Sequence, residues 1–172
     1  WVEIDLAAIQ HNIRLISRTA GRPVMAVVKG NAYGHGMVEV ARAALAAEAT
    51  WCAVARIEEA LELRAAGIGC PLLVLGYTAP LMALEAARRD IRLTVYELSI
   101  AQQYAAIVAA AGQTLRVHVK VDTGMSRLGQ PPVQVPEFMT ALRGLPGIVV
   151  EGMFTHFARA DQHEEHFTNF QL

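Results

Sequence analysis

Short apolar runs alternate with segments of helical periodicity along the whole chain, and this alternation limits the possible folds more than any other feature. The apolar runs that we expect to be strands are residues 24–28, 51–55, 71–75, 91–95, 114–121 and 148–154. The expected helices cover residues 6–20, 37–45, 58–64, 81–88, 100–111 and 133–143, with a last helix from about residue 161 to the end. Such an alternation with short connections predicts a parallel α/β sheet. An open doubly wound sheet and a (β/α)8 barrel both fit the pattern.

The fifth run favours the barrel. Its apolar residues alternate strictly with the polar residues Arg116, His118, Lys120 and Asp122. A central strand of an open sheet would be apolar on both faces, because helices cover both, whereas a polar face suits the inner wall of a barrel that lines a site. We therefore predict a (β/α)8 TIM-type barrel, truncated here to about six β/α units. Because eight units need about 250 residues, residues 1–172 are expected to form a partial barrel domain of a longer polypeptide.

The composition narrows the classes of function. The chain is 53% hydrophobic and 18% charged with a formal net charge of -1, which fits a soluble globular protein and not the basic surface of a nucleic-acid-binding protein. No apolar run approaches the roughly 20 residues of a membrane helix, and the first residues lack the pattern of a signal peptide. Cys52 and Cys70 each lie in an apolar run, as core thiols of a protein in a reducing compartment do. We expect a cytoplasmic protein.

Lys29 stands at the end of the first predicted strand, in the stretch Val28-Lys29-Gly30-Asn31-Ala32-Tyr33-Gly34-His35-Gly36. A strand end holds a side chain rigidly, and glycines let a ligand approach the backbone, so the position suits a nucleophilic or Schiff-base lysine. The local pattern fits a solvated lysine in a glycine-rich loop equally well.

Two further polar clusters follow later strands. Lys120 and Asp122 end the fifth run and precede Arg127, and His156 follows the sixth run. In a parallel barrel the carboxyl ends of the strands form one rim, where active sites are built, so these groups and Lys29 are expected to share that rim. Each has an ordinary alternative, such as an interior ion pair of Lys120 with Asp122, a solvated Arg127 or a satisfied His156.

A histidine pair near the end of the chain is the remaining candidate for chemistry. His163 and His166 are three residues apart on the last predicted helix. A protein metal site needs at least three such ligands, and no third one is evident. We expect no metal site.

Three segments resemble signatures of the alanine racemases. Residues 28–36 resemble the pyridoxal-phosphate lysine motif of that family. The second segment is His118-Val119-Lys120-Val121-Asp122-Thr123-Gly124-Met125-Ser126-Arg127-Leu128-Gly129, and the third is Glu151-Gly152-Met153-Phe154-Thr155-His156-Phe157-Ala158. The start, Val2-Glu3-Ile4-Asp5-Leu6 with His11-Asn12-Ile13, is also similar to the usual start of these enzymes. The departures are Gly30, where the family usually has alanine, and Ser126, where glycine is common.

The resemblance implies a barrel that binds pyridoxal 5'-phosphate, with Lys29 and Arg127 as catalytic residues. Lys29 would form the internal aldimine with the cofactor and act as one of the two bases that move the α-proton. Lys120, commonly carbamylated in this family, would carry a negative charge that orients Arg127. Arg127 would then bond the phenolic oxygen of the cofactor.

The other implied cofactor-binding residues surround the ring and the phosphate. Tyr33 would reach the phosphate and help to position Lys29. His156 would lie by the pyridine ring and support a further arginine, and Leu75 would pack near the ring.

The implied activity is racemisation of L-alanine to D-alanine, which supplies cell-wall peptidoglycan, by a homodimer. Strands seven and eight, the C-terminal β-domain, the arginine facing the pyridine nitrogen and the tyrosine base from the partner subunit have no counterpart in residues 1–172. We therefore expect this piece alone to be nearly inactive. The alternatives are a serine or broad-specificity racemase of the same fold, a non-catalytic pyridoxal-phosphate barrel that stores or delivers cofactor, and a purely structural fragment. The Lys120–Arg127 signature, which the storage proteins lack, counts against the second of these.

Overall fold

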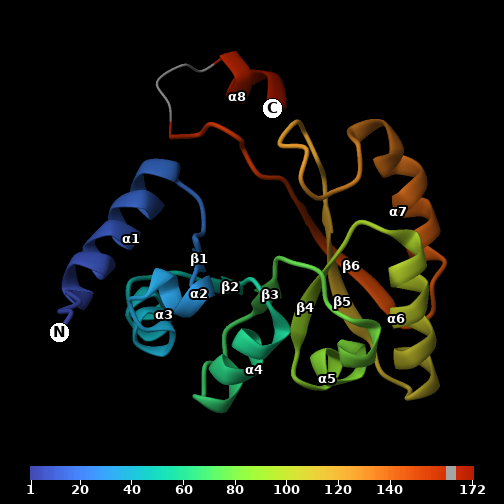
Figure 1. The fold of residues 1–172 in the computed structure, drawn as a ribbon, viewed down its shortest axis with the longest axis horizontal. Helices are drawn as coiled ribbons and strands as arrows, with labels where there is room; N and C mark the ends of the chain where they lie inside the picture. The colour runs from blue at the N-terminus through green and yellow to red at the C-terminus, as the bar shows by residue number, and fades with distance from the viewer. Residues whose placement is uncertain (162–165) are drawn as a thin grey trace. The chain divides into compact units, whose positions relative to one another are not determined.

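The computed structural model describes residues 1–161 and 166–172. The chain divides into two compact units, of which the first comprises residues 1–78 and 88–93 and the second residues 79–87 and 94–172. Both units alternate parallel strands with helices, and the six strands follow one another in chain order, β1-β2-β3-β4-β5-β6 (Figure 1). A doubly wound sheet would reverse its strand order at a switch point. The sequential order therefore favours the barrel over the open sheet.

The first unit holds β1 to β3 and the start of β4. Its elements are α1 (Leu6–Ala20), β1 (Met25–Val27), α2 (Lys29–Tyr33), α3 (Met37–Ala46), β2 (Trp51–Val54), α4 (Ile57–Ala65), β3 (Leu72–Val74) and the first residues of β4 (Ile91–Val95). The parallel register pairs Ala26 with Cys52 and Cys52 with Leu72. All three residues of β3 are buried, as expected of a strand that is covered on both faces.

Capping residues mark both ends of α1, which spans the predicted residues 6–20. The side chain of Asp5 accepts a hydrogen bond from the N–H of Ala8 at 3.0 Å, and Gly21 closes the helix with φ of +60°. An acidic N-cap satisfies an N–H group that the helix leaves free, and glycine adopts the left-handed conformation of a helix end without a steric cost. The two residues therefore fix where the helix begins and ends.

The second unit contains the last two strands and the helices that follow η1. Its elements are η1 (Pro80–Met82), most of α5 (Ala83–Arg88), the end of β4, α6 (Leu98–Ala110), β5 (Leu115–Lys120), η2 (Pro132–Gln134), α7 (Val135–Arg143), β6 (Ile148–Phe154) and α8 (His166–Gln171). β5 and β6 run side by side in parallel (Figure 1), with a register shift between Val117 and His118. Of the described residues, no helix is long and apolar enough to cross a membrane.

The predicted alternation of β5 is confirmed for its apolar face and modified for its polar one. Leu115, Val117 and Val119 are fully buried. On the other face Arg116 is exposed, whereas His118 and Lys120 are buried. The polar face is thus solvated at the start of the strand and buried at its carboxyl end.

A glycine on the neighbouring strand makes the burial of His118 possible. A Cβ atom added to Gly152 of β6 would lie 2.7 Å from the imidazole ring. His118 Nε2 lies 3.3 Å from the carboxylate of Glu151, the residue before this glycine. Packing against a bare backbone and a polar contact together account for a buried imidazole on this strand.

Several boundaries differ from the predicted ones. Four strands are one or two residues shorter than expected, while residues 91–95 and 148–154 are strands as predicted. Two helices begin with a 3₁₀ turn that contains a proline near its start, because proline fixes φ and has no N–H to donate. The helix α2 was not predicted. The predicted start of the last helix falls partly on residues 162–165, which lie outside the described residues; α8 is described from His166.

The two cysteines are free, and they are hydrogen-bonded to each other. Cys52 is fully buried in β2, and Cys70 is half-buried two residues before β3. The hydrogen bond from Cys52, assisted by the Arg64 guanidinium and opposed by burial, lowers the pKa of Cys70 to about 7. The same hydrogen bond, together with burial, raises the pKa of Cys52. The two thiols should therefore differ strongly in reactivity.

Iodoacetamide is expected to alkylate Cys70 and to spare Cys52 in the native protein. The thiolate is the reacting species, and a pKa of about 7 leaves about half of Cys70 ionised at pH 7, against a few per cent of an ordinary cysteine with a pKa of about 8.5. The alkylation rate should rise between about pH 6 and pH 8 and then level off. Peptide mass spectrometry after timed labelling measures both rates. A Cys52→Ala variant should move the midpoint for Cys70 upwards, and equal labelling of the two thiols would contradict the assignment.

Candidate functional site

Lys29 lies just beyond β1, at the first position of α2. The prediction placed Lys29 at the end of the strand. In the structure β1 ends at Val27, and Lys29 follows the strand after one further residue. That residue, Val28, is buried and donates its N–H to the carbonyl of Ala53 at 2.8 Å. The sheet hydrogen bonding thus continues up to the residue before Lys29, and the lysine itself is half-buried.

The backbone after Lys29 forms a left-handed turn. φ is positive at five consecutive residues, with values of +61°, +54°, +52°, +56° and +88° at Gly30, Asn31, Ala32, Tyr33 and Gly34. A left-handed helix costs an L-residue roughly 1–2 kcal/mol, and only single residues visit it routinely. Strain of this kind persists where the surrounding structure holds it, and it is concentrated at functional sites. The turn therefore marks this end of β1 as a candidate site.

Two side-chain hydrogen bonds hold this turn in place. The side-chain oxygen of Asn31 accepts a hydrogen bond from the N–H of Met37, the first residue of α3, at 2.8 Å. The carboxylate of Glu59 in α4 accepts one from the N–H of Gly30 at 2.6 Å. Sequence reasoning singled out neither residue. The only local signal was the Gly30–Asn31 pair, since glycine and asparagine tolerate positive φ best.

Of the predicted residues in the first unit, Tyr33 lies next to Lys29. The Nζ atom of Lys29 is 6.0 Å from the centre of the Tyr33 ring, which is the outer limit of a cation–π contact. Tyr33 itself is 63% exposed, so its ring is available to a ligand. Leu75 follows β3 directly, is half-buried, and donates its N–H to the carbonyl of Val54 at 2.8 Å. It therefore lies at the carboxyl end of its strand, as predicted.

Lys120, the last residue of β5, is only 7% exposed. Its Nζ atom lies 4.7 Å from the centre of the Phe154 ring. Burial and the positive charge of Arg127 lower the pKa of Lys120, while the negative charge of Asp122 acts in the opposite direction. The fraction of neutral, nucleophilic amine is therefore larger than for a solvated lysine at the same pH.

Arg127 is exposed on the loop that follows β5. Gln130 closes the loop: its N–H donates to the Lys120 carbonyl, and its carbonyl accepts from the N–H of Asp122, both at 2.9 Å. Inside the loop, Asp122 Oδ1 accepts from the N–H groups of Ser126 at 2.9 Å and Gly124 at 3.0 Å, and these bonds lower the pKa of Asp122. The carboxylate thus organises the Arg127 loop, a role that the predicted alternative of a simple Lys120–Asp122 pair does not include.

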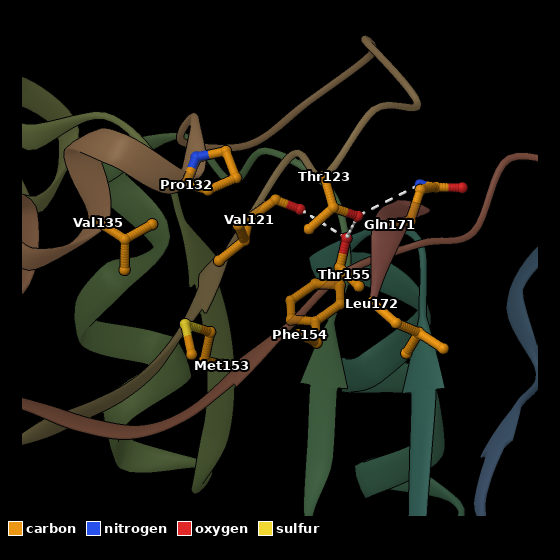
Figure 2. Close-up of a pocket in the computed structure, with 9 residues that line it drawn as sticks. All are labelled: Val121, Thr123, Pro132, Val135, Met153, Phe154, Thr155, Gln171 and Leu172. Atoms are coloured by element: carbon orange, nitrogen blue, oxygen red, sulfur yellow. Dashed lines mark hydrogen bonds between the residues drawn. The ribbon is translucent and has the colours of Figure 1, made fainter. Parts of the chain in front are cut away.

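His156 is exposed beyond the end of β6. Its carbonyl accepts a hydrogen bond from the side chain of Gln171 at 3.3 Å, and Gln171 also donates to Thr123 Oγ1 at 3.2 Å. The hydroxyls of Thr123 and Thr155 are 2.8 Å apart, and Figure 2 shows this chain of side chains. The end of α8 is therefore fastened to the carboxyl ends of β5 and β6. His163 lies outside the described residues, so the predicted absence of a histidine-based metal site remains a prediction.

A hollow of about 420 Å³ opens beside this network. Its lining is largely apolar and is formed by Val121, Thr123, Pro132, Val135, Met153, Phe154, Thr155, Gln171 and Leu172 (Figure 2). The hydroxyls of Thr123 and Thr155 and the side-chain amide of Gln171, which belong to this lining, are hydrogen-bonded to one another. None of Lys120, Arg127 and His156 lines the hollow. Its chemistry suits packing against apolar groups and not the binding of a charged ligand.

Each unit places its charged side chains at the carboxyl ends of its own parallel strands. The first unit brings Tyr33 to Lys29 after β1, and the second brings the Arg127 loop to Lys120 after β5. This is the end of a parallel barrel at which ligands bind. Fold and side chains together define a domain of the (β/α)8-barrel class with a candidate site at the carboxyl ends of its strands.

Residues 4–172 match the family model of the alanine racemase N-terminal domain, and the chain belongs to that family. The alanine racemase of Desulforamulus reducens is 48% identical over 175 residues, which cover 100% of this chain and 47% of that protein. The crystal structure of alanine racemase from Bacillus anthracis with bound L-Ala-P has a TM-score of 0.92 and 41% identity, and covers 99% of this chain and 45% of that one. A histidine racemase from Leuconostoc mesenteroides also has a TM-score of 0.92, at 34% identity, with 96% of this chain and 45% of that one covered.

These relatives confirm the predicted (β/α)8 barrel, of which the chain holds six β/α units. The chain spans slightly less than half the length of the relatives that it matches. The resemblance found in the sequence motifs is therefore confirmed as membership of the family.

Proposed function

We propose that the full-length protein interconverts L- and D-alanine with pyridoxal 5'-phosphate as cofactor. The observation that carries this proposal is Lys29, which stands on a strained left-handed turn at the carboxyl end of β1 in a member of the alanine racemase family. Strain of this kind has to be held by tertiary contacts, and it is concentrated where a reactive group must be positioned. A solvated lysine in an ordinary loop, the alternative left open by the sequence, would need no such turn.

The residues after β1 fit the cofactor. A half-buried amine on a rigid turn can form a covalent bond with an aldehyde, and the exposed Tyr33 hydroxyl beside it can donate to a phosphate. The bound cofactor would accept the electron pair that remains on the α-carbon when its proton leaves. Lys29 would hold the cofactor through Nζ and carry the α-proton on one face as one of two bases. The second base, a tyrosine in this family, would come from outside residues 1–172.

The polar residues after β5 and β6 would set the electrostatics of the site. The lowered pKa of Lys120 favours its neutral amine, which is the form that reacts with carbon dioxide. As a carbamate, Lys120 would change from a cation that repels Arg127 into an anion that orients it. Arg127 would then donate to the phenolic oxygen of the cofactor. His156 would lie by the pyridine ring, and Leu75 would pack against that ring.

We propose alanine as the substrate. The alternative is a racemase of the same fold that acts on serine or on a broad range of amino acids. The matching histidine racemase from Leuconostoc mesenteroides acts, by its name, on a different amino acid on a very similar fold. Initial racemisation rates of the full-length protein on L-alanine, L-serine and L-histidine would decide between these substrates.

We further propose a cytoplasmic homodimer that supplies D-alanine for peptidoglycan, because the family resemblance and the two free thiols fit that setting.

Borohydride reduction of the full-length protein with pyridoxal phosphate is expected to attach the cofactor permanently to Lys29. Residues 1–172 contain two lysines, Lys29 and Lys120, so peptide mass spectrometry of this region has two possible answers. A Lys120→Ala variant should keep the label on Lys29. A label on Lys120, or an unlabelled region 1–172, would contradict the assigned roles, and labelling without racemisation of any amino acid would favour a cofactor-storage protein.

A further inference from the structure

Glu59 connects three backbone groups at the carboxyl ends of β1 and β2. Its Oε1 atom accepts the hydrogen bond from the N–H of Gly30 at 2.6 Å. Its Oε2 atom accepts from the N–H groups of Ala55 at 2.8 Å and Arg56 at 3.1 Å. Gly30 is 29 residues away along the chain and directly follows Lys29. One carboxylate thus joins the residue after the lysine to the end of β2 and to the start of α4.

Helix capping does not account for all three of these bonds. A glutamate at the third position of a helix commonly accepts from the N-cap N–H, and Oε2 does this at Arg56. The bond from Oε1 to Gly30 lies outside the helix and is not needed to begin it. Since hydrogen bonds to an ionised carboxylate are about twice as strong as neutral ones, this bond is a firm restraint on the loop. Glu58, the preceding residue, is exposed and offers a comparison on the same turn.

The restraint acts where the strain begins. Gly30 is the first of the five left-handed residues, and its N–H belongs to the peptide bond that it shares with Lys29. Because a peptide unit is planar, holding this N–H fixes the plane on the carboxyl side of the Lys29 Cα atom. The direction of the Lys29 side chain and the start of the turn that carries Tyr33 are therefore set by the same bond.

We infer that Glu59 is a positioning residue that fixes the Lys29 backbone for cofactor attachment and proton transfer. The catalytic part of this inference rests on the proposed function of Lys29. Glu59 acts through the Gly30 N–H, by restraining the conformation from which the lysine amine reacts. Positioning of this kind carries a large effect, because a displacement of about 1 Å at a reacting group can cost about 10²-fold in rate.

The variant Glu59→Gln tests the inference in the full-length protein. A glutamine amide has one acceptor oxygen and an NH₂ donor, so it cannot accept hydrogen bonds on both sides as the carboxylate does. In the cofactor-free variant, hydrogen exchange of the amides at residues 30–33 should rise at least about tenfold, because the local opening is no longer restrained. With cofactor, the rate at which Lys29 becomes labelled and kcat should each fall about 10- to 100-fold.

Two control variants separate positioning from general stability. Glu58→Gln removes the neighbouring charge on the same turn and should leave exchange and kcat within about twofold of the wild type. Ala60→Gly weakens α4 through the lower helix propensity of glycine at a fully buried site whose side chain accepts no hydrogen bond. It should lower the thermal midpoint yet leave exchange at residues 30–33 and labelling of Lys29 unchanged.

The outcomes are distinct. Unchanged exchange at residues 30–33 in Glu59→Gln, or an equal effect of Ala60→Gly, would overturn the positioning role. Raised exchange with unchanged labelling and kcat would overturn its catalytic part. If Lys29 of the wild-type protein is not labelled at all, the proposed function fails, while the exchange measurement, which needs no cofactor, still decides whether Glu59 holds the turn.

Discussion

Replacing Lys29 by alanine is expected to lower the racemase activity of the full-length protein by at least about 10³-fold. The substitution removes both the covalent attachment of the cofactor and one of the two proposed bases, and general acid–base catalysis alone contributes about 10²- to 10⁴-fold. The fold should persist, because Lys29 is half-buried and its strained turn is held through backbone groups. The measurement is kcat/KM for L-alanine, together with the far-UV circular dichroism and the thermal midpoint of the variant.

Rescue by an added amine is the control for Lys29→Ala, because it distinguishes the loss of the amine from general damage to the protein. Added methylamine should restore part of the activity of Lys29→Ala, because a free amine can replace the lost base. Lys120→Ala should also lower activity, since Lys120 neighbours Arg127. Methylamine should not restore the activity of this variant, because its Lys29 amine is still present. A Lys29→Ala variant that keeps more than about a tenth of the wild-type kcat/KM would contradict the assigned role.

Replacing Gly129 by alanine is expected to destabilise the protein by about 3 kcal/mol or more. Gly129 lies in the Arg127 loop, directly before Gln130, with φ of +130°, a conformation that residues with a side chain rarely adopt. An added Cβ atom would lie 2.6 Å from the backbone nitrogen of Asp122 and 2.8 Å from the carbonyl carbon of Val121. Both obstacles are main-chain atoms of the segment that continues β5, so the loop must move. The thermal midpoint should fall by roughly 6–12 °C, and activity should fall with it because Arg127 shares the loop.

Gly112→Ala is the matched control for this prediction. Gly112 also has positive φ, at +61°, but a Cβ atom there would meet nothing within 4 Å. Only the cost of the left-handed conformation remains, which is about 1 kcal/mol. Equal thermal midpoints for the two variants would show that the contact with the Asp122 backbone does not limit the loop.

Most of the fold was predictable because it depends on neighbours in the sequence. The strands lie in short runs with an apolar or an alternating pattern, and the limits of α1 follow from the carboxylate of Asp5 and from the backbone freedom of Gly21. The remaining errors are local: prolines begin two 3₁₀ turns ahead of the expected helices, and the hydrogen bonding of β1 ends before Lys29. Barrel and open sheet were separated by the alternation of β5 and then by the strand order.

The candidate site was predictable as a set of residues but not as a geometry. The motifs named Lys29, Lys120 and Arg127, and their roles stay proposals. Glu59 could not be found from the sequence, because its partner Gly30 is 29 residues away along the chain. The sequence also could not show that Asp122 accepts hydrogen bonds from two N–H groups of its own loop, because a Lys120–Asp122 ion pair was equally compatible with the sequence.

By itself, the sequence determined the alternation of strands and helices, the end of the sheet at which charged groups collect, and the family. These follow from periodicity and from short motifs, whose effects reach only a few residues along the chain. Only the tertiary structure decided that the residues after Lys29 turn left-handed and that Lys120 is buried against Phe154. Both states are unfavourable in an isolated peptide. They exist because groups distant in sequence, the Glu59 carboxylate in one case and the β6 side chains in the other, supply the hydrogen bond or the packing that offsets their cost.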